Sequence, residues 1–461
     1  MVSLNIFKHA STALAKNKDF KQILIVFGVS LCGLNMGLSI AWTSPAIPKL
    51  LQPEYGITID EASYLAVIDP LAMMIGSPIF AKLADLIGRK RTMYFIPLLF
   101  LISWLTPALT KNIYILYISR VFVGFEYAAV FSTLPSYVGE VTTPKIRSKY
   151  GNLLVTLMFI GQFLPNFVGY FCDIPTMAYV LLEVPIITFI IIYFIPESPY
   201  FYIMKNDMDN ARKSLEILRS TKNVDGELNA ITAAVQRQMV EPGGFKDLFL
   251  VRSNRRALMI CNLTRMVQQL CGINAFIVFA QYIFIEAGTG FPSAYGAMIF
   301  TGMLTVSNIF SNVINDKYGK RLAMVFSCTG IFFALLGETI FFVLKQYTTI
   351  DTTPANWFPV FGLAIYVFCF CLGQSNVPTL ILGELFSSNI KPHGIMVMNV
   401  IFAMYMAGMN KLFQVLMSHF GLSVPFAFCT ICAFTGIFLC YYFIPETKGK
   451  TLEEIQMLLK K

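Results

Sequence analysis

Three amide side chains lie close together in an otherwise apolar part of this chain. Gln268, Gln269 and Asn274 belong to the string QQLCGIN, which is followed by a long uncharged run. A buried amide is costly unless it forms hydrogen bonds. Because an amide both donates and accepts hydrogen bonds, these side chains suit a neutral ligand rich in hydroxyl groups. They could equally join neighbouring helices to one another, and the residue types alone leave both interpretations open.

A charged turn occurs twice, half a chain apart. The string ADLIGRKR contains Asp85 and Gly88, and the string NDKYGKR contains Asp316 and Gly319. A glycine at this place permits a tight reversal of the backbone. Further charged residues that repeat in step are Glu140, Arg147, Glu384 and Lys391. The repetition predicts two parallel repeats of six helices each, with these charges at one end of the bundle.

Several ionisable residues interrupt the apolar runs. In the middle of a bilayer each costs about 2.5–3.5 kcal/mol unless it is paired or hydrated, so these side chains are expected to face the interior of a helix bundle. They are Asp69, Arg120, Glu126, Glu183, Arg265, Glu338 and Lys411.

The elements that position these residues are predicted by composition. The 461-residue chain is 56% hydrophobic and only 13% charged, which is too little polar material for the surface of a soluble domain of this size. Runs of about 20 apolar residues indicate membrane-spanning helices, and the sequence predicts an all-α membrane protein with twelve of them. Their approximate ranges are 23–43, 62–82, 92–110, 113–138, 150–172, 177–195, 256–285, 293–315, 321–344, 357–382, 392–418 and 424–444.

The basic residues predict the topology. With both termini in the cytoplasm, only Lys49, Lys111 and Lys345 of the 35 Lys and Arg residues fall in outer loops, as the excess of cytoplasmic positive charge requires. We therefore expect a cytoplasmic N-tail (1–22), a six-helix bundle (23–195), a cytoplasmic helical linker (196–255), a second six-helix bundle (256–444) and a cytoplasmic C-tail (445–461).

Other classes of function find no support in the sequence. There is no glycine-rich phosphate loop and no pattern of a catalytic triad, so we do not expect an enzyme. We also expect no metal and no cofactor, since Cys429 and Cys432 have metal-like spacing but lie in an apolar run without further ligands. The net charge of +9 follows from topology, so we expect no nucleic-acid partner; the expected partners are a small molecule and the lipid bilayer.

The motifs together resemble the sugar porter family of the major facilitator superfamily, over the whole length of the chain. The residues that carry the resemblance are Asp85 with Gly88-Arg89-Lys90, Arg120 with Gly124, Pro135-Ser136-Tyr137 with Glu140 and Arg147, Pro196-Glu197-Ser198-Pro199, Gln268-Gln269 with Gly272-Ile273-Asn274, Asp316 with Gly319-Lys320-Arg321, Gly383-Glu384, and Pro445-Glu446-Thr447-Lys448-Gly449. The string AWTSPAIPKL resembles the insect trehalose-type facilitators of that family.

The resemblance implies an inner gate made of charged residues. Arg89, Glu140 and Arg147 would form one network, and Lys320, Glu384 and Lys391 would form the other. Such networks can hold one end of the bundle closed in one state and must break when that end opens. The full set of expected gate residues is Asp85, Arg89, Glu140, Arg147, Glu197, Asp316, Lys320, Arg321, Glu384, Lys391 and Glu446.

The resemblance also implies that Gln268, Gln269 and Asn274 contact a sugar. The family's other pocket positions are altered here, and the residues that stand at them are Val155, Leu304, Cys371, Thr379 and Phe402. The scaffold is therefore conserved in its motifs, whereas the pocket in the second half differs.

The function implied is facilitated transport of trehalose, glucose or a related hexose or disaccharide across the plasma membrane by a monomer. The alternatives are a proton-coupled symporter and a sugar sensor that does not transport. Proton-coupled relatives carry a first-span carboxylate at the position of Asn35, which cannot titrate. Asp69 and Glu126 are the alternative carboxyl groups that could carry a proton, near Arg120.

Overall fold

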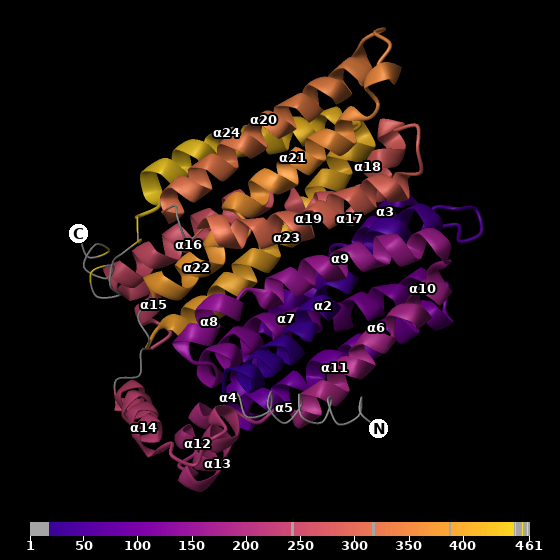
Figure 1. The fold of residues 1–461 in the computed structure, drawn as a ribbon. Helices are drawn as coiled ribbons and strands as arrows, with labels where there is room; N and C mark the ends of the chain where they lie inside the picture. The colour runs from indigo at the N-terminus through magenta and orange to yellow at the C-terminus, as the bar shows by residue number, and fades with distance from the viewer. Residues whose placement is uncertain are drawn as a thin grey trace, which may run out of the picture.

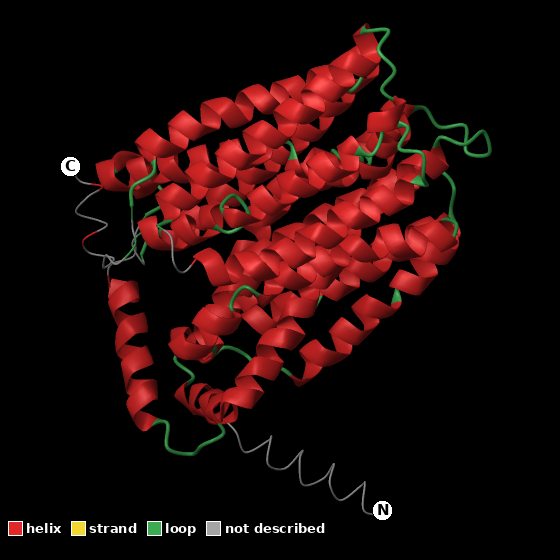
Figure 2. Cartoon of the chain, turned by 45° about the horizontal axis from the view of Figure 1, so that its top comes forward, coloured by secondary structure: helices red, strands yellow, loops and turns green. Residues whose placement is uncertain are grey.

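The computed structural model describes residues 18–240, 244–315, 319–386, 389–446, 448, 454 and 459. Throughout these residues the regular structure is helical, and Figure 2 shows the helices joined by short loops. Ten helical segments are long and apolar enough to cross a membrane, and a bent pair of helices makes an eleventh. The expected all-α membrane fold is thus confirmed. The remaining predicted span corresponds to α19 (Ser293–Asn315), a helix of 23 residues that buries the polar side chains of Thr301, Ser307 and Asn308.

The first half of the chain contains six spans. They are α2 (Lys18–Leu50), α3 (Ile59–Tyr64) with α4 (Ile68–Ile87), α5 (Arg89–Met93) with α6 (Phe95–Leu109), α7 (Ile113–Val141), α9 (Leu153–Phe171), and α10 (Ile174–Leu181) with α11 (Glu183–Phe194). The short α8 (Pro144–Tyr150) links α7 to α9. The first span reaches further than the expected range of 23–43, since α2 continues through the string SPAIPKL to Leu50.

The second half repeats this plan. Its elements are α16 (Arg252–Leu270), α17 (Ile273–Val278) and α18 (Ala280–Ala287) as one broken span, then α19, α20 (Lys320–Tyr347), η1 (Thr353–Ala355), α21 (Phe358–Leu372) with α22 (Val377–Leu385), α23 (Lys391–Phe420) and α24 (Ser423–Phe443). Figure 1 shows the two halves side by side, the first in indigo to magenta and the second in salmon to yellow.

Short helices connect the halves. These are α12 (Pro199–Met204), α13 (Met208–Arg219), α14 (Asp225–Val240) and α15 (Asp247–Leu250). The first three share a small apolar cluster that includes Leu215, Leu228 and Ile231. They lie beyond one end of the bundle (Figure 1), which is called the linker end below; the opposite end, near α3 and α18, is called the far end.

The seventh span breaks beside the three amides. Gly272 separates α16 from α17 with a φ of 91°, a left-handed conformation that favours glycine. A second break follows Val278, and the chain there bends by 77°. Because a broken helix leaves backbone groups without their helical partners, it can be tolerated only where protein or a cavity surrounds it. The amides thus sit where two helix ends face the middle of the bundle.

Candidate functional site

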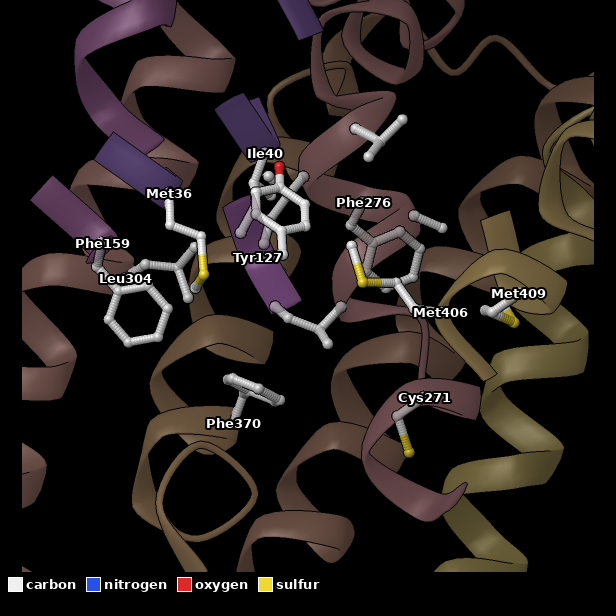
Figure 3. Packing of buried hydrophobic residues seen from close by; sticks show 14 of the residues in the cluster. Met36, Ile40, Tyr127, Phe159, Cys271, Phe276, Leu304, Phe370, Met406 and Met409 are labelled. Atoms are coloured by element: carbon white, nitrogen blue, oxygen red, sulfur yellow. The ribbon is translucent and has the colours of Figure 1, made fainter. Parts of the chain in front are cut away.

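A cavity of about 120 Å³ lies between the two halves. Figure 3 shows Met36, Tyr127, Phe370 and Met406 around this space. The polar side chains on its wall are Tyr127, Gln162, Arg265, Gln268, Gln269, Asn274, Ser375 and Thr379. A mostly apolar wall with a few polar groups is typical of a small-molecule site.

The cavity is more accessible from the linker end. Thr379, in the linker-end part of its span, is exposed, and Val155 and Phe402 are half-buried. On the far side of the cavity, Ile40 and Ile277 are buried. A ligand in this conformation would therefore enter and leave towards the linker end.

The three predicted amides line the cavity but differ in what they bond. Gln268 is engaged on both sides: its Oε1 accepts from Arg265 at 2.9 Å and its Nε2 donates to the carbonyl of Gln374 at 2.6 Å. Asn274 donates to Asn410 at 2.9 Å. By contrast, the buried Oε1 of Gln269 has no hydrogen-bond partner. Of the three, Gln269 is the one whose side-chain oxygen is both fully buried and without a hydrogen-bond partner.

Two polar residues of the wall were not predicted as ligands. Gln162, on α9 of the first half, has a buried Oε1 without a partner. Arg265, predicted only to face the interior, is 8% exposed and lies over the ring of Phe402, 4.8 Å from its centre. The sequence signal for these two residues is a single amide or a single cation within an apolar run. Such a signal does not reveal whether the side chain lies on the helix face that lines the cavity.

The altered pocket positions fall into two groups. Val155, Thr379 and Phe402 line the cavity. Leu304 and Cys371 are fully buried against each other, with the Cys371 Sγ 3.7 Å from the Leu304 carbonyl oxygen, and they are not part of the wall. Only the first three substitutions therefore shape the space available to a ligand.

At the linker end of the first half, Arg89 is the centre of a charge network. It lies 3.1 Å from Glu140 and 3.2 Å from Asp85. Glu197 accepts from the backbone N–H of Lys90 at 3.0 Å, at the start of α5. Arg147 does not join the network in this conformation; it is exposed and donates to the carbonyl of Gly139 at 3.2 Å.

The second half repeats the arrangement. Lys320 pairs with Glu384, and its backbone N–H donates to Glu446 at 3.2 Å. Lys391 donates to the carbonyl of Gly383 at 3.0 Å, as its counterpart Arg147 does in the first half. Arg321 lies over the ring of Tyr441 at 4.4 Å. Asp316 falls outside the described residues.

The predicted role of the repeated glycines is confirmed at Gly88 and wrong at Gly319. Gly88 has a φ of 110°, so it does permit a tight turn, whereas Gly319 has an ordinary φ of −68°. A Cβ atom at either glycine would collide with a carboxylate, that of Glu197 at Gly88 and that of Glu446 at Gly319. Both glycines therefore leave space for a glutamate side chain to pack against the N-terminus of the helix that follows the glycine.

Each of these ion pairs stays within one half. Arg147 and Lys391, from opposite halves, are close enough for their like charges to repel each other. No ion pair in the described ranges joins the two halves at the linker end. Near this end the halves are joined by a neutral contact instead, in which Thr156 of α9 donates to Asn308 of α19 at 3.0 Å.

The far end, in contrast, is bridged by polar contacts between the halves. Lys411 pairs with Asp60 at 2.6 Å and lies 4.1 Å from the ring centre of Tyr64. Asn410, which also accepts from Asn274, donates to the carbonyl of Ala66 at 2.7 Å. Further bridges join Ser63 to Gln414, Tyr170 to Tyr295, and Gln281 to Ser44 and Asn166. We call these residues the far-end clamp.

The residues considered for proton coupling lie in the first half, behind the cavity wall. Arg120 lies over Trp42 at 4.2 Å and donates to the carbonyl of Ser39, and it forms no ion pair with Asp69. Glu126 is fully buried and both its oxygens lack partners. Asn35 donates to Thr188 at 2.9 Å rather than contacting Arg120. None of Asn35, Asp69, Arg120 and Glu126 lines the cavity.

One prediction about the ionisable residues was wrong. Glu183 is exposed, because it begins α11 after the break that splits the sixth span at Leu182. Lys411 is only half-buried and reaches the far-end clamp. The other five residues of that set, Asp69, Arg120, Glu126, Arg265 and Glu338, are buried as expected.

Two halves of six helices around a central cavity, closed at one end, define a multi-pass membrane transporter. The family model described as "Sugar (and other) transporter" matches residues 57–459, and the chain belongs to that family. It is a transporter and not an enzyme, and a small-molecule sugar is the class of its substrate.

Similar proteins agree with this assignment. The facilitated trehalose transporter Tret1 of Bombyx mori is 31% identical over 457 residues, which cover 95% of this chain and 86% of the relative. The protein of the same name from Culex quinquefasciatus is 28% identical over 444 residues, covering 95% and 85%.

Two solved structures share the fold. The proton:xylose symporter XylE bound to 6-bromo-6-deoxy-D-glucose aligns with a TM-score of 0.78 at 18% identity, over 96% of this chain and 100% of that chain. An inward open conformation of XylE from E. coli aligns with a TM-score of 0.75 at 17% identity, over 94% and 99%. At these identities the likeness concerns the fold alone.

Proposed function

We propose that this chain carries a sugar of hexose or disaccharide size down its concentration gradient by alternating access. The observation that carries the proposal is the cavity between the halves, with unpaired amide oxygens of Gln162 and Gln269 on opposite walls. Hydroxyl groups of a sugar would donate to both oxygens at once. Because the two residues come from different halves, a bound sugar would couple the movement of one half to the other.

The charged residues support a gating role. In the present conformation the far-end clamp is closed and the linker-end pairs stay within their halves. When the far end opens, the halves rock together at the linker end, and Arg147 and Lys391 exchange their backbone carbonyls for carboxylates of the opposite half, Arg147 for that of Glu384 and Lys391 for that of Glu140. The opposite charges then close that end, as expected of an element with two stable arrangements. The units that rock are residues 23–195 and 256–444, with 196–255 as the connection.

We place the linker end, together with the tails 1–22 and 445–461, in the cytoplasm, and the protein in the plasma membrane. The basic residues support this orientation. The three lysines of the far end are engaged locally: Lys49 and Lys345 donate to the last carbonyls of nearby helices, and Lys111 pairs with Glu54. The cavity and both gates lie within one chain, so a monomer is the working unit.

Proton-coupled symport is the second candidate. The buried carboxyl groups of Asp69 and Glu126 favour it, since buried acidic residues within membrane spans are the groups that proton-coupled carriers use as relays. Asn35 argues against it, since this residue cannot titrate and is occupied by Thr188. We therefore favour uniport.

Counterflow into liposomes tests the proposal. Liposomes containing the purified protein are loaded with unlabelled trehalose or glucose, and the entry of a trace of labelled sugar is followed over time. A carrier gives a transient accumulation of label above the outside concentration. The reason is that each outward movement of unlabelled sugar brings the binding site back to the outer face, where it binds labelled sugar. Absence of the transient for every mono- and disaccharide tested would contradict transport and favour a sensor.

A further inference from the structure

The cavity contains a cation without an anionic partner. Arg265 is 92% buried, and its guanidinium reaches the cavity wall from α16. It donates to Gln268 at 2.9 Å and to Thr379 at 3.1 Å, which leaves three of its five N–H groups for other acceptors. None of the ion pairs formed by the described residues includes it.

Such a charge is costly to bury. Removing a guanidinium from water without a counter-charge is unfavourable, and charged residues at membrane depth usually mark a binding site or an ion path. The ring of Phe402, 4.8 Å away, offsets only part of this cost. Among the described residues, the walls of the cavity carry amides and hydroxyl groups but no carboxylate. The missing negative charge is therefore one that a ligand can supply.

The other polar groups specify the rest of that ligand. The free Oε1 atoms of Gln162 and Gln269 are acceptors, so they suit hydroxyl donors and would repel an anion. The cavity thus offers one position for a negative charge, at Arg265, and separate positions for hydroxyl groups. A ligand that satisfies both is a sugar that carries an acidic group.

We propose that the cavity prefers a sugar acid, a monosaccharide bearing one carboxylate, over the corresponding neutral sugar. This inference rests on the proposed function, in which the cavity binds a sugar. The planar guanidinium presents parallel N–H groups that match the two oxygens of a carboxylate. A doubly charged phosphate would call for a second cation, and Arg265 is the single Lys or Arg on the described wall.

Titration calorimetry on the purified protein tests this preference. Glucuronate, glucose and glucose 6-phosphate are compared at fixed ionic strength. We expect glucuronate to bind on the order of 10- to 100-fold more tightly than glucose, the range for a hydrogen bond to a charged group, and glucose 6-phosphate to bind less tightly than glucuronate. Arg265→Gln should abolish the preference for glucuronate over glucose, whereas Arg265→Lys should retain part of this preference.

Arg256→Gln is the matched control. Arg256 lies on the same helix and donates to the carbonyl of Leu459, away from the cavity, so its removal should not alter the preference. Thermal unfolding of each variant shows that it is folded. Equal binding of glucuronate and glucose, or a preference that survives Arg265→Gln, would overturn the inference, as would tighter binding of glucose 6-phosphate. Counterflow of glucose is measured in parallel. If the preference for glucuronate is absent but glucose counterflow is present, the inference fails and the proposed transport function stands. If glucuronate binds with the expected preference but counterflow is absent, the proposed transport function fails and the inference about binding stands.

Discussion

The far-end clamp should set the balance between the two conformations of the protein. Lys411 is its charged centre, since its ammonium group lies 2.6 Å from Asp60, 3.2 Å from Ser63 and 4.1 Å from the ring centre of Tyr64. These contacts join α23 of one half to α3 of the other, so they exist only while the far end is closed. Replacing Lys411 by Met keeps most of the side-chain volume and removes all three polar contacts.

The size of the effect follows from exposure. The Asp60 side chain is 63% exposed, so the ion pair contributes at most about 1 kcal/mol. The contact with the Tyr64 ring adds about 0.5–1 kcal/mol. The free-energy difference between far-end-closed and far-end-open states should therefore change by roughly 1–2 kcal/mol in favour of opening, which is a factor of about 5–30 in their ratio.

Distances between spin labels report this shift. Labels on cysteines introduced at Gln52 and Asp351, both exposed far-end residues of different halves, are placed in a background without the half-buried native cysteines. Lys411→Met should increase the fraction of long distances. Lys111→Met is the control, because it removes the pair with Glu54 inside one half. Identical distance distributions for Lys411→Met and the parent protein would refute the reasoning.

Three further predictions concern the gate, the cavity and the glycines. Glu140→Gln leaves the buried Arg89 with a single carboxylate partner, the exposed Asp85, and should slow sugar uptake into liposomes because the gate is weakened by about 1–3 kcal/mol. Uptake at the parent rate would contradict a gating role, and the double variant Arg89→Glu/Glu140→Arg should restore part of the uptake. Gln269→Leu should weaken sugar binding measured by calorimetry by about 1–2 kcal/mol without lowering the unfolding temperature, and unchanged affinity would exclude direct contact. Gly319→Ala should destabilise the protein by about 1–3 kcal/mol in thermal unfolding because the new Cβ meets Glu446; the double variant with Glu446→Ala should recover stability, and no loss in the single variant would disprove the clash.

The repeated architecture was predictable because its signals are local and occur twice. Apolar runs of span length fix the helices, and the doubled turns place Arg89 and Lys320 at the same end as Glu140 and Glu384. The structure brings each cation to the carboxylate of its own half. Sequence spacing is enough to predict the depth of these residues in the membrane, and their opposite charges are enough to predict that they pair.

The details of the cavity were not predictable in this way. Gln268 and Gln269 are adjacent in sequence, yet one is saturated by Arg265 and Gln374 while the other keeps a free acceptor. That difference depends on how α16 is rotated against α22, which no local pattern encodes. The pairing of Lys411 with Asp60 likewise joins positions on opposite halves and arises only once the halves have packed.

Sugar uptake with and without an imposed pH gradient tests the central claim most directly. Liposomes containing the purified protein are given labelled sugar outside, first at equal pH on both sides and then with an acidic exterior, and the final internal concentration is measured. A uniporter equilibrates the sugar at its outside concentration in both cases. Accumulation above that level under the gradient, abolished by Asp69→Asn or Glu126→Gln, would contradict facilitated transport and establish proton-coupled symport.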